Sequence, residues 1–413
     1  MSLPPRQGGP VDQKTGAQPQ SPFRSPRPSI LQILAQRAYG KETAARLAPF
    51  QGDPISFEIA FAPVLPKLFG MDEGPSDIVS RKRDHLAVVL ERDVGFGGLT
   101  TGLEKIRFMP NALPEIDYRA VDLSTTLLGI PLAAPLIINS MTGGPEKAAT
   151  INLHLTEAAA HLGIAMAVGS QRVALEDKGQ SGFSPALRRA APNIPLFANL
   201  GAAQIRGPKG VDRARAALDM IAADGLFIHL NPVQEAIQNG GDTDWTGVIS
   251  GLERLVSAGI PIAVKEVGFG LSPNVVRRLV EIGVRIIDVA GAGGTNWARV
   301  EGFREGHLAQ RAALFTEWGL PTASAIRHAR AIAPSTMLIG SGGIKTAHDV
   351  AAALRLGADL VGQAAASLSA ALESTEAVVA HFQEIIEGLR TICFATGSAD
   401  IASLKSAPLI EDA

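Results

Sequence analysis

A regular alternation of apolar and polar segments begins after Val121. Each unit consists of a short apolar run, a turn rich in glycine, serine or asparagine, and an alanine-rich stretch with helical spacing. Short runs that are apolar throughout predict strands buried on both faces, as in a parallel sheet covered by helices. We expect eight strands, at Leu136–Asn139, Ala165–Val168, Leu196–Asn199, Leu226–Leu230, Ile262–Lys265, Ile286–Val289, Leu338–Gly340 and Leu360–Gly362.

This repeated pattern predicts an α/β fold, specifically a (β/α)8 TIM barrel. Eight strand–helix units over about 250 residues is the usual size of that barrel. The structural alternative is a doubly wound open sheet. The barrel requires its chemistry to lie in the loops after the carboxyl ends of the strands, and the polar residues of this sequence fall there.

Proline marks a different organisation at the start of the chain, where twelve of the 27 prolines lie in the first 75 residues. We expect a disordered, proline-rich tail at residues 1–28, because too little apolar surface is present there to offset the entropy of ordering. Residues 29–75 are expected to form an N-terminal extension with a helix at Ile30–Leu47. The single barrel domain then covers residues 76–395, and a C-terminal tail covers residues 396–413.

The composition indicates a globular protein and argues against a protein that binds nucleic acid or membranes. Hydrophobic residues make up 46% of the chain and charged residues 19%, which suits a globular domain with a sizeable core. The formal net charge of −2 gives no general attraction to nucleic acid or to an anionic membrane. No apolar run reaches the ~20 residues of a membrane helix, and the single cysteine, Cys393, argues for a reducing compartment. We therefore expect a soluble, cytoplasmic protein that binds neither nucleic acid nor membranes.

The predicted strand ends carry amides, hydroxyls, one histidine and several charges. One polar strand end would be ordinary, but a succession of them indicates a binding site on one face of the barrel. The segments are Ser140–Gly144, Gly169–Arg172, Asn199–Gly201, His229–Glu235, Lys265–Glu266, Gly291–Trp297, Gly340–Ile344 and Gly362–Ala364.

The last two of these segments predict a phosphate site. A glycine-rich turn at Gly340–Gly343 lets the backbone approach an anion closely, and the loops after strands 7 and 8 form the recurrent phosphate site of this barrel. The helix expected to begin near Thr346 would add its positive end. A purely structural turn is the alternative.

Individual charged residues suggest further contacts. Lys265 ends an apolar strand, where its ammonium needs an anion, an electron-rich ligand atom or a salt bridge with Glu266 or Glu235. Glu235 is a plausible ligand for a hard cation such as Mg²⁺, which takes one or two carboxylates together with phosphate oxygens. Residues 81–85 contain three cations and a histidine, which suits either an anionic ligand or a solvated helix start.

Together these residues closely resemble type 2 isopentenyl diphosphate isomerase, a flavin-dependent enzyme of isoprenoid synthesis. Single motifs are shared with other flavin barrels, but the ordered set over about residues 76–395 is specific. The matching segments are Arg81-Lys82 with His85, Met141–Gly144, Gly169–Arg172, Asn199–Gly201, His229–Glu235 with Gly241–Asp244, Lys265–Gly270, Gly293–Trp297 with Glu301, and Ser341–Ile344.

The resemblance implies a barrel that holds FMN. The flavin and its ribityl chain would be surrounded by Met141, Thr142, Gly143, Ser170, Asn199, Lys265 and Thr295. The FMN phosphate would be held by Gly342, Gly343, Gln363 and Ala364.

The resemblance also implies substrate and catalytic residues. Glu235 would bind Mg²⁺, and Gln234 would act in positioning or proton relay, because an amide has no useful pKa. Substrate contacts are expected from Arg81, Lys82, His85, Ser170, Gln171, Arg172 and Gln234. The residues expected to take part in catalysis are Gln234, His229, Asn231 and Glu301, the last as an auxiliary proton carrier or as a structural group.

The implied reaction interconverts isopentenyl diphosphate and dimethylallyl diphosphate by adding one proton at C4 and removing another at C2. No net redox change occurs, so the reduced flavin would serve as acid and base, after reduction by NADPH or another reductant. Lys265 would tune the flavin electrostatically. Homotetramers or homo-octamers are expected from the same resemblance.

The sequence departs from the family pattern at Lys345, where arginine is usual, at Gln363, where methionine is usual, and in the long segment before Arg81. A typical family member would begin near Met71, so residues 1–70 are either an added segment or an untranslated extension. Two other functions compete with the isomerase. An FMN-dependent 2-hydroxy acid oxidase or dehydrogenase would need a His-Gly pair, which the chain lacks, and a non-catalytic flavin or isoprenoid-diphosphate binding barrel would not need the substrate residues.

Overall fold

A computed structural model describes residues 84–141, 146–176 and 182–410 of the chain. All the described residues belong to one unit, residues 73–413. The predicted tail at 1–28 and the extension at 29–75 with its helix lie outside the described residues. Arg81, Lys82, Thr142 and Gly143 also lie outside them.

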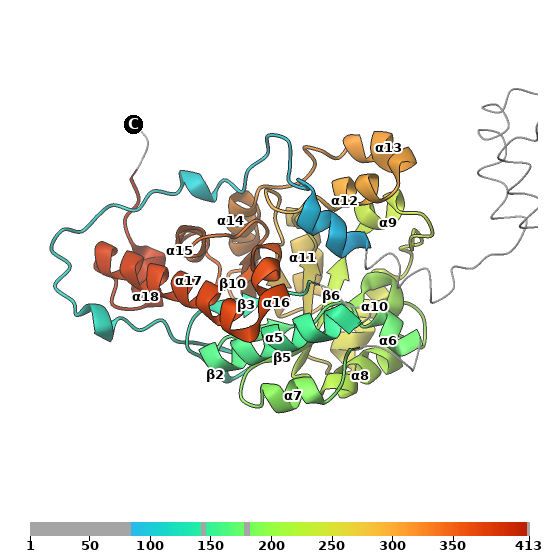
Figure 1. The fold of residues 1–413 in the computed structure, drawn as a ribbon, viewed down its shortest axis with the longest axis horizontal. Coiled ribbons are helices and arrows are strands. Elements are labelled where there is room, and N and C mark those ends of the chain that lie inside the picture. Colours follow the sequence, from blue (N-terminus) through green and yellow to red (C-terminus); the bar gives the residue numbers. More distant parts are fainter. Residues whose placement is uncertain (1–83, 142–145, 177–181, 411–413) are drawn as a thin grey trace, which may run out of the picture. The chain divides into compact units, whose positions relative to one another are not determined.

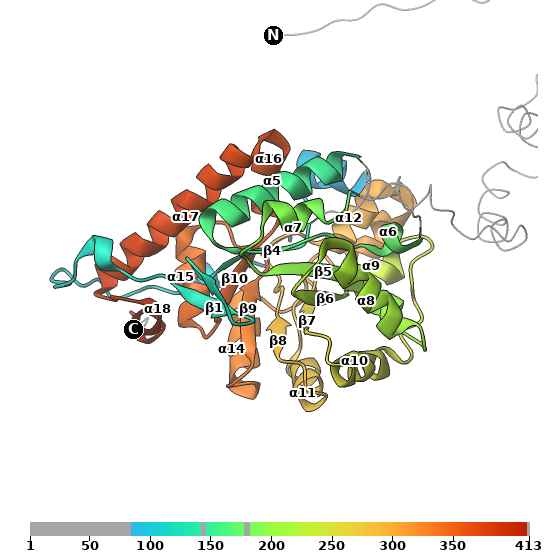
Figure 2. The same cartoon turned by 90° about the horizontal axis from the view of Figure 1, so that it is seen from below.

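Within the described residues, eight parallel strands close into a barrel in chain order, with the last strand hydrogen-bonded to the first. Each strand falls on a predicted apolar run, so the (β/α)8 fold is confirmed, and the doubly wound open sheet is excluded (Figure 2). Most strand residues are buried, because helices cover the outside of the barrel and side chains fill its inside. The strands are β3 (Leu136–Ile138), β4 (Ala165–Ala167), β5 (Leu196–Gly201), β6 (Gly225–Leu230), β7 (Ile262–Glu266), β8 (Ile286–Asp288), β9 (Met337–Ser341) and β10 (Leu360–Gln363).

Helices follow the strands and surround the barrel (Figure 1). The two longest, α5 (Glu146–Leu162) and α17 (Thr375–Thr396), lie side by side and join the start of the barrel segment to its end. None of the described helices combines the length and the apolar character needed to cross a membrane. Residues 84–91 are also helical, and the other α-helices with both ends described are α6 (Arg172–Glu176), α7 (Ala186–Ala190), α8 (Gly210–Ile221), α9 (Pro232–Ile237), α10 (Val248–Ser257), α11 (Pro273–Glu281), α12 (Trp297–Arg304), α13 (Ala309–Ala313), α14 (Thr322–Ile332), α15 (Ala347–Arg355), α16 (Leu368–Glu373) and α18 (Ile401–Ser406).

A hairpin that the sequence pattern does not predict closes the amino-terminal end of the barrel. Strands β1 (Thr125–Leu127) and β2 (Ile130–Leu132) pair in antiparallel fashion around Leu128 and Gly129, both with positive φ. Leu127 and Leu132 are buried in one cluster with side chains inside the barrel. Three-residue strands carry too little alternation to be recognised from the sequence, although a two-residue turn with positive φ is typical of a tight hairpin.

The segment predicted as a C-terminal tail includes α18. Its Ile401 and Leu404 are buried in the main core, and Leu409 forms an isolated bridge with Phe108. The end of the chain as described thus packs against the barrel unit rather than extending from it.

An arginine bracket supports β5 at its amino-terminal end. Arg188 pairs with Asp224, with 2.5 Å between Nη2 and Oδ2, and donates to backbone carbonyls that include that of Ala191. The same Asp224 oxygen accepts the N–H of Leu196, the first residue of β5. One guanidinium therefore ties the end of α7, the start of β5 and the start of β6 together.

The same bracket occurs at β9. Arg330 pairs with Asp359 at 2.5 Å and donates to the carbonyl of Ala333, and the Asp359 oxygen accepts the N–H of Leu338. The two segments read Arg-Arg-Ala-Ala-Pro-Asn-Ile-Pro-Leu and Arg-Ala-Ile-Ala-Pro-Ser-Thr-Met-Leu. Because β5 and β9 are four strands apart in the closed barrel, the brackets belong to opposite halves of it.

Replacing Arg188 by alanine should lower the free energy of unfolding by about 1–3 kcal/mol, because several carbonyls and Asp224 lose their donor. Urea denaturation measures the change. Arg189→Ala alters the exposed neighbouring arginine and should change the free energy by less than about 0.5 kcal/mol. Equal losses in the two variants would show that the bracket contributes nothing specific.

Candidate active site at the barrel mouth

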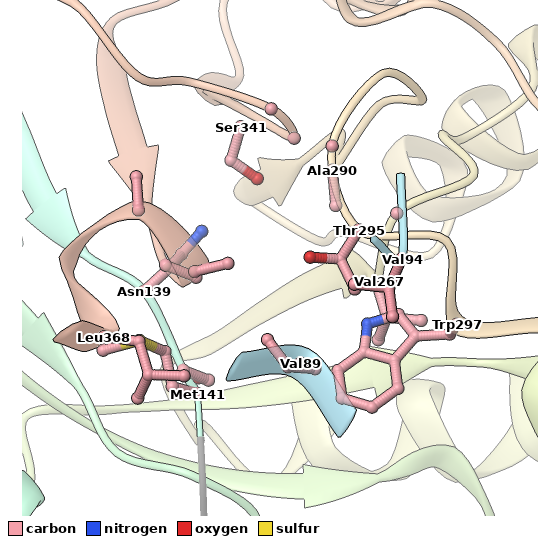
Figure 3. A pocket seen from close by; sticks show the side chains of 18 of the residues that line it. Val89, Val94, Asn139, Met141, Val267, Ala290, Thr295, Trp297, Ser341 and Leu368 are labelled. Carbon is pink, nitrogen blue, oxygen red and sulfur yellow. The ribbon is translucent and has the colours of Figure 1, made fainter. Parts of the chain in front are cut away.

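A cavity of about 940 Å³ opens at the carboxyl ends of the strands, the face that the barrel prediction requires. In the close view, Asn139 and Ser341 project into one side of it, and Trp297 and Val89 line another (Figure 3). The structure thus brings strand ends from around the barrel to one site. Of the predicted site residues, the cavity wall contains His85, Met141, Ser170, Arg172, Asn199, His229, Asn231, Gln234, Glu235, Lys265, Thr295, Gly342, Gly343 and Ala364.

Among the described residues, three predicted site residues are not part of the cavity wall. Gln171 is buried, donates to the carbonyl of Ala217 and accepts the N–H of Asn199, both at 2.9 Å, so it joins the barrel wall to α8. Gln363 is also buried and forms a 2.5 Å hydrogen bond with His381. Glu301 is fully buried behind Gln234. All three side chains are therefore bonded within the protein and do not face the cavity.

The glycine turn at the predicted phosphate site has a backbone that favours glycine. Gly342 and Gly343 have φ of 101° and 72°, and a Cβ on Gly342 would overlap the carbonyl oxygen of Gly291. The amino end of α15, which we expected to face an anion, carries a capping box in which Asp349 accepts the N–H groups of Lys345 and Thr346, so these two groups are not free for a ligand. An anion here would therefore depend on the glycine backbone and on Lys345, which lines the cavity.

A salt bridge between Lys265 and Glu266 was one alternative that the sequence allowed, and the two side chains do not form it. The Lys265 ammonium donates to the backbone carbonyl of Glu266 at 2.8 Å. The Glu266 carboxylate accepts three backbone N–H groups, those of residues 267–269, at 2.5–2.6 Å. Burial raises the pKa of Glu266 to about 7, although these donors and Lys265 oppose the shift. Burial lowers the pKa of Lys265, against the attraction of Asp288 and Glu266, so a negative charge on a ligand would stabilise its ammonium form.

Glu301 organises the side chains on one wall of the cavity. Its Oε1 accepts from Gln234 Nε2 at 3.0 Å and lies 2.8 Å from His85 Nε2, and its Oε2 accepts from Arg304 at 2.6 Å. Burial alone would raise the pKa of Glu301, but the hydrogen bond and charge of His85, with Gln234 and Arg304, lower it to about 2. A carboxylate this acidic is a weak base at neutral pH, which favours a positioning role over proton carriage.

Gln234 and Glu235 stand on the first turn of α9, directly after β6. Asn231 donates to both, at 3.0 Å to Gln234 Oε1 and 2.9 Å to Glu235 Oε1. Gln234 therefore accepts from Asn231 and donates to Glu301, which fixes the orientation of its amide at the cavity wall. Burial raises the pKa of Glu235, although the N–H of Asp242 and the Asn231 amide oppose the shift. A cation would stabilise this carboxylate.

Arg172 and His229 both line the cavity. Arg172 pairs with Asp242 at 2.6 Å and with Glu176 at 3.2 Å. His229 Nδ1 lies 2.8 Å from Asn199 Oδ1. Because the Asn199 amide nitrogen already donates to a carbonyl, its oxygen is the acceptor, so Nδ1 of His229 carries the proton. Protonation of the ring at Nε2 as well would give it a positive charge that attracts an anion in the cavity.

Several residues of the site go beyond what the sequence indicated. Asn139 ends a predicted strand, and Ser341 and Trp297 lie in segments predicted to form the binding site, but the sequence assigns no individual role to any of the three side chains. Asp288 lies in an apolar run and is predicted only as part of a strand. Their positions at or near strand ends could have marked them in the sequence as candidate site residues. Their contacts with one another could not be predicted, because they depend on closure of the barrel.

The family of this chain follows from its similarity to known proteins. The FMN-dependent dehydrogenase family matches residues 229–411. The isopentenyl-diphosphate delta-isomerase of Xanthobacter autotrophicus is 55% identical over 341 residues, which cover 82% of this chain and 99% of that protein. The chain belongs to the isopentenyl-diphosphate delta-isomerase family. The enzyme of the same name from Stutzerimonas stutzeri is 53% identical and covers 81% of this chain and 97% of its own.

The resemblance to this family is confirmed, and with it the isomerase class and an FMN-dependent domain. Solved structures add the fold. Two mandelate oxidase structures match with TM-scores of 0.54 and 0.55 at 14% and 15% identity, over 92% and 82% of this chain and 99% of each of those chains. At this identity they show a shared barrel only.

Gly342→Ala should abolish or strongly weaken FMN binding to this isomerase, because a Cβ would collide with Gly291 and the turn would have to move. Quenching of flavin fluorescence on titration measures the affinity. Gly306→Ala is the matched control, since nothing lies within 4 Å of the position that its Cβ would take. FMN affinity unchanged in Gly342→Ala would contradict a phosphate site at this turn.

Proposed function

We propose that the cavity catalyses the interconversion of isopentenyl and dimethylallyl diphosphate with reduced FMN and Mg²⁺. The observation that carries this proposal is the juxtaposition, in one cavity, of a glycine-built turn, a buried lysine and an oriented amide beside apolar side chains. The apolar part includes Met141, Leu368 and Trp297 (Figure 3). It suits a five-carbon hydrocarbon that passes through a cation-like centre.

The residues present fit FMN. The cavity volume of about 940 Å³ is at the upper end of the range for small-molecule and cofactor sites. Among the described residues, Asn139 Oδ1 and Ser140 Oγ are buried in this wall without a hydrogen-bond partner, as expected where a ligand completes the bonding. Gly342, Gly343 and Ala364 would hold its phosphate, and Lys265 would face the flavin.

When bound, reduced FMN would supply a proton donor and acceptor for the allylic shift. The protein residues position the substrate. Gln234, held between Asn231 and Glu301, presents its amide to the hydrocarbon and keeps the reacting carbons in place. Lys265 would stabilise negative charge on the cofactor, because its ammonium is buried where a charge interaction is strong. His85 stabilises the ionised Glu301 and so keeps the Gln234 amide from turning.

The diphosphate would lie toward Arg172 and His229, with Mg²⁺ on Glu235. No group of three or more acidic, histidine or cysteine side chains suited to a metal occurs in the described residues. Mg²⁺ would therefore bind through one carboxylate together with diphosphate oxygens and water, which is a usual arrangement for this ion. Arg81 and Lys82 would add charge to the same ligand. NADPH or another reductant is proposed as the source of electrons for the flavin.

Incubation of the protein with isopentenyl diphosphate, FMN, Mg²⁺ and dithionite under anaerobic conditions should give dimethylallyl diphosphate, detected by mass spectrometry or NMR. Omitting the reductant should stop product formation, since the oxidised flavin lacks the proton to donate. Lack of product under reducing conditions, with FMN bound, would overturn the proposal.

Glu235→Gln should raise the Mg²⁺ concentration for half-maximal activity by about 10-fold or more, because a neutral amide is a poorer ligand for a hard cation. FMN affinity should stay the same. Glu253→Gln changes an exposed carboxylate on α10 and should leave the Mg²⁺ dependence as in the wild type. An unaltered Mg²⁺ titration in Glu235→Gln would remove this residue from the metal site.

A further inference from the structure

Asp288 is a buried carboxylate below the cavity that ties together three strand ends. It terminates β8 and is fully buried. Its Oδ2 accepts from Asn139 Nδ2 at 2.7 Å, and its Oδ1 accepts from Ser341 Oγ at 2.5 Å and from the N–H of Ala290 at 3.2 Å. Asn139 follows β3 and Ser341 ends β9, so the carboxylate links its own strand to β3, which is not its neighbour in the barrel.

This arrangement determines which atom Asn139 offers to a ligand. Its amide nitrogen is committed to Asp288, so its oxygen is the atom left over. That oxygen is buried and has no hydrogen-bond partner in the described part of the chain, while Asn139 itself is 3% exposed and lines the cavity. A buried acceptor without a partner destabilises a protein by about 1–3 kcal/mol. The site therefore calls for a ligand that donates an O–H or N–H at this point.

The neighbours of Asn139 indicate which part of a ligand lies there. Ser341 directly precedes the Gly342 turn, and a Cβ on Gly362 would collide with Asn139 Nδ2 and lie 3.0 Å from Ser341 Cβ. Ala364, two residues on, also lines the cavity. Asn139 thus stands next to both proposed phosphate loops. In FMN, the group adjacent to the phosphate is the hydroxylated ribityl chain.

We propose that Asp288 is a positioning residue for the cofactor: it orients Asn139 so that the amide oxygen accepts a hydrogen bond from a ribityl hydroxyl of FMN. The inference rests on FMN binding in this cavity, as in the proposed function. Asp288 is not part of the cavity wall, so it acts through Asn139 and not by contact. Its other oxygen accepts from Ser341 Oγ, and the amide oxygen in Asp288→Asn can keep that bond, so this variant alters the Asn139 contact alone.

Asp288→Asn tests the orientation directly. The new amide can donate to the Asn139 oxygen and turn that amide round, which would present a donor to the cavity where an acceptor is needed. FMN should then bind about 10-fold more weakly, the equivalent of one lost hydrogen bond. Asn139→Ala should cause a similar loss, and the double variant should bind no more weakly than Asn139→Ala, because the two residues act on one contact. Additive losses, or wild-type affinity in Asp288→Asn, would overturn the proposal.

An FMN analogue with an unhydroxylated five-carbon chain provides a second readout. The wild type should bind it more weakly than FMN, and Asp288→Asn and Asn139→Ala should add no further loss. A loss that persists with the analogue would assign the Asn139 oxygen to another donor and refute the ribityl contact. If Asp288→Asn does not fold, the affinities of Asn139→Ala for FMN and for the analogue still test whether the Asn139 oxygen contacts the ribityl chain.

Asp359→Asn is the matched control, since this carboxylate lies in the arginine bracket at the other end of the barrel. It should lower the midpoint of thermal unfolding and leave FMN affinity unchanged. If the wild type itself does not bind FMN, the proposed function fails; if it binds FMN but the variants do so equally well, only the role of Asp288 fails.

Discussion

The free-energy cost of burying charged side chains determines how the residues at the mouth of this barrel are arranged. Lys265, Glu266, Asp288 and Glu301 are all buried, and an ion moved from water to a protein interior loses several kcal/mol of solvation unless partners replace the water. Lys265, Glu266 and Asp288 find their partners at or just after strand ends, and Glu301 finds its partners on helices. Because a closed barrel brings all the strand ends within reach of one another, the fold itself supplies the groups that replace water.

The same constraint divides the cavity into regions of different character. On the side of β9, β10 and β3, the contacts come from glycine backbone, Asn139 and Ser341, with Lys345 nearby. On the side of β4 to β6, the wall carries Arg172 and His229. The protein has almost no net charge, so anionic ligands must be bound by such local sets. Two separate sets suit a site that holds a phosphorylated cofactor and a phosphorylated substrate together.

Much of this could be predicted from the sequence, because a barrel strand that is buried on both faces appears as a short apolar run, and the residue after the run falls at the mouth. His229, Gln234 and Lys265 are found in this way. The side-chain directions could not be predicted. Gln171 and Gln363 occupy strand ends too, yet both turn into the wall, since each finds buried hydrogen-bond partners there. The link between Asn139 and Asp288 was out of reach, because it joins residues far apart in the chain across the barrel interior.

The paired arginine brackets have an evolutionary consequence. Below β5 and β9 the chain repeats one segment with one hydrogen-bonding plan, while the strand ends above them differ: Asn199 and Gly201 on one side, Ser341 and Gly343 on the other. Duplication and fusion of a four-stranded unit would leave this pattern. The brackets at the amino-terminal ends of the strands would be retained in both copies, and the residues at the carboxyl ends would have diverged. In such a molecule, strands β3–β6 and strands β7–β10 would be sister structures.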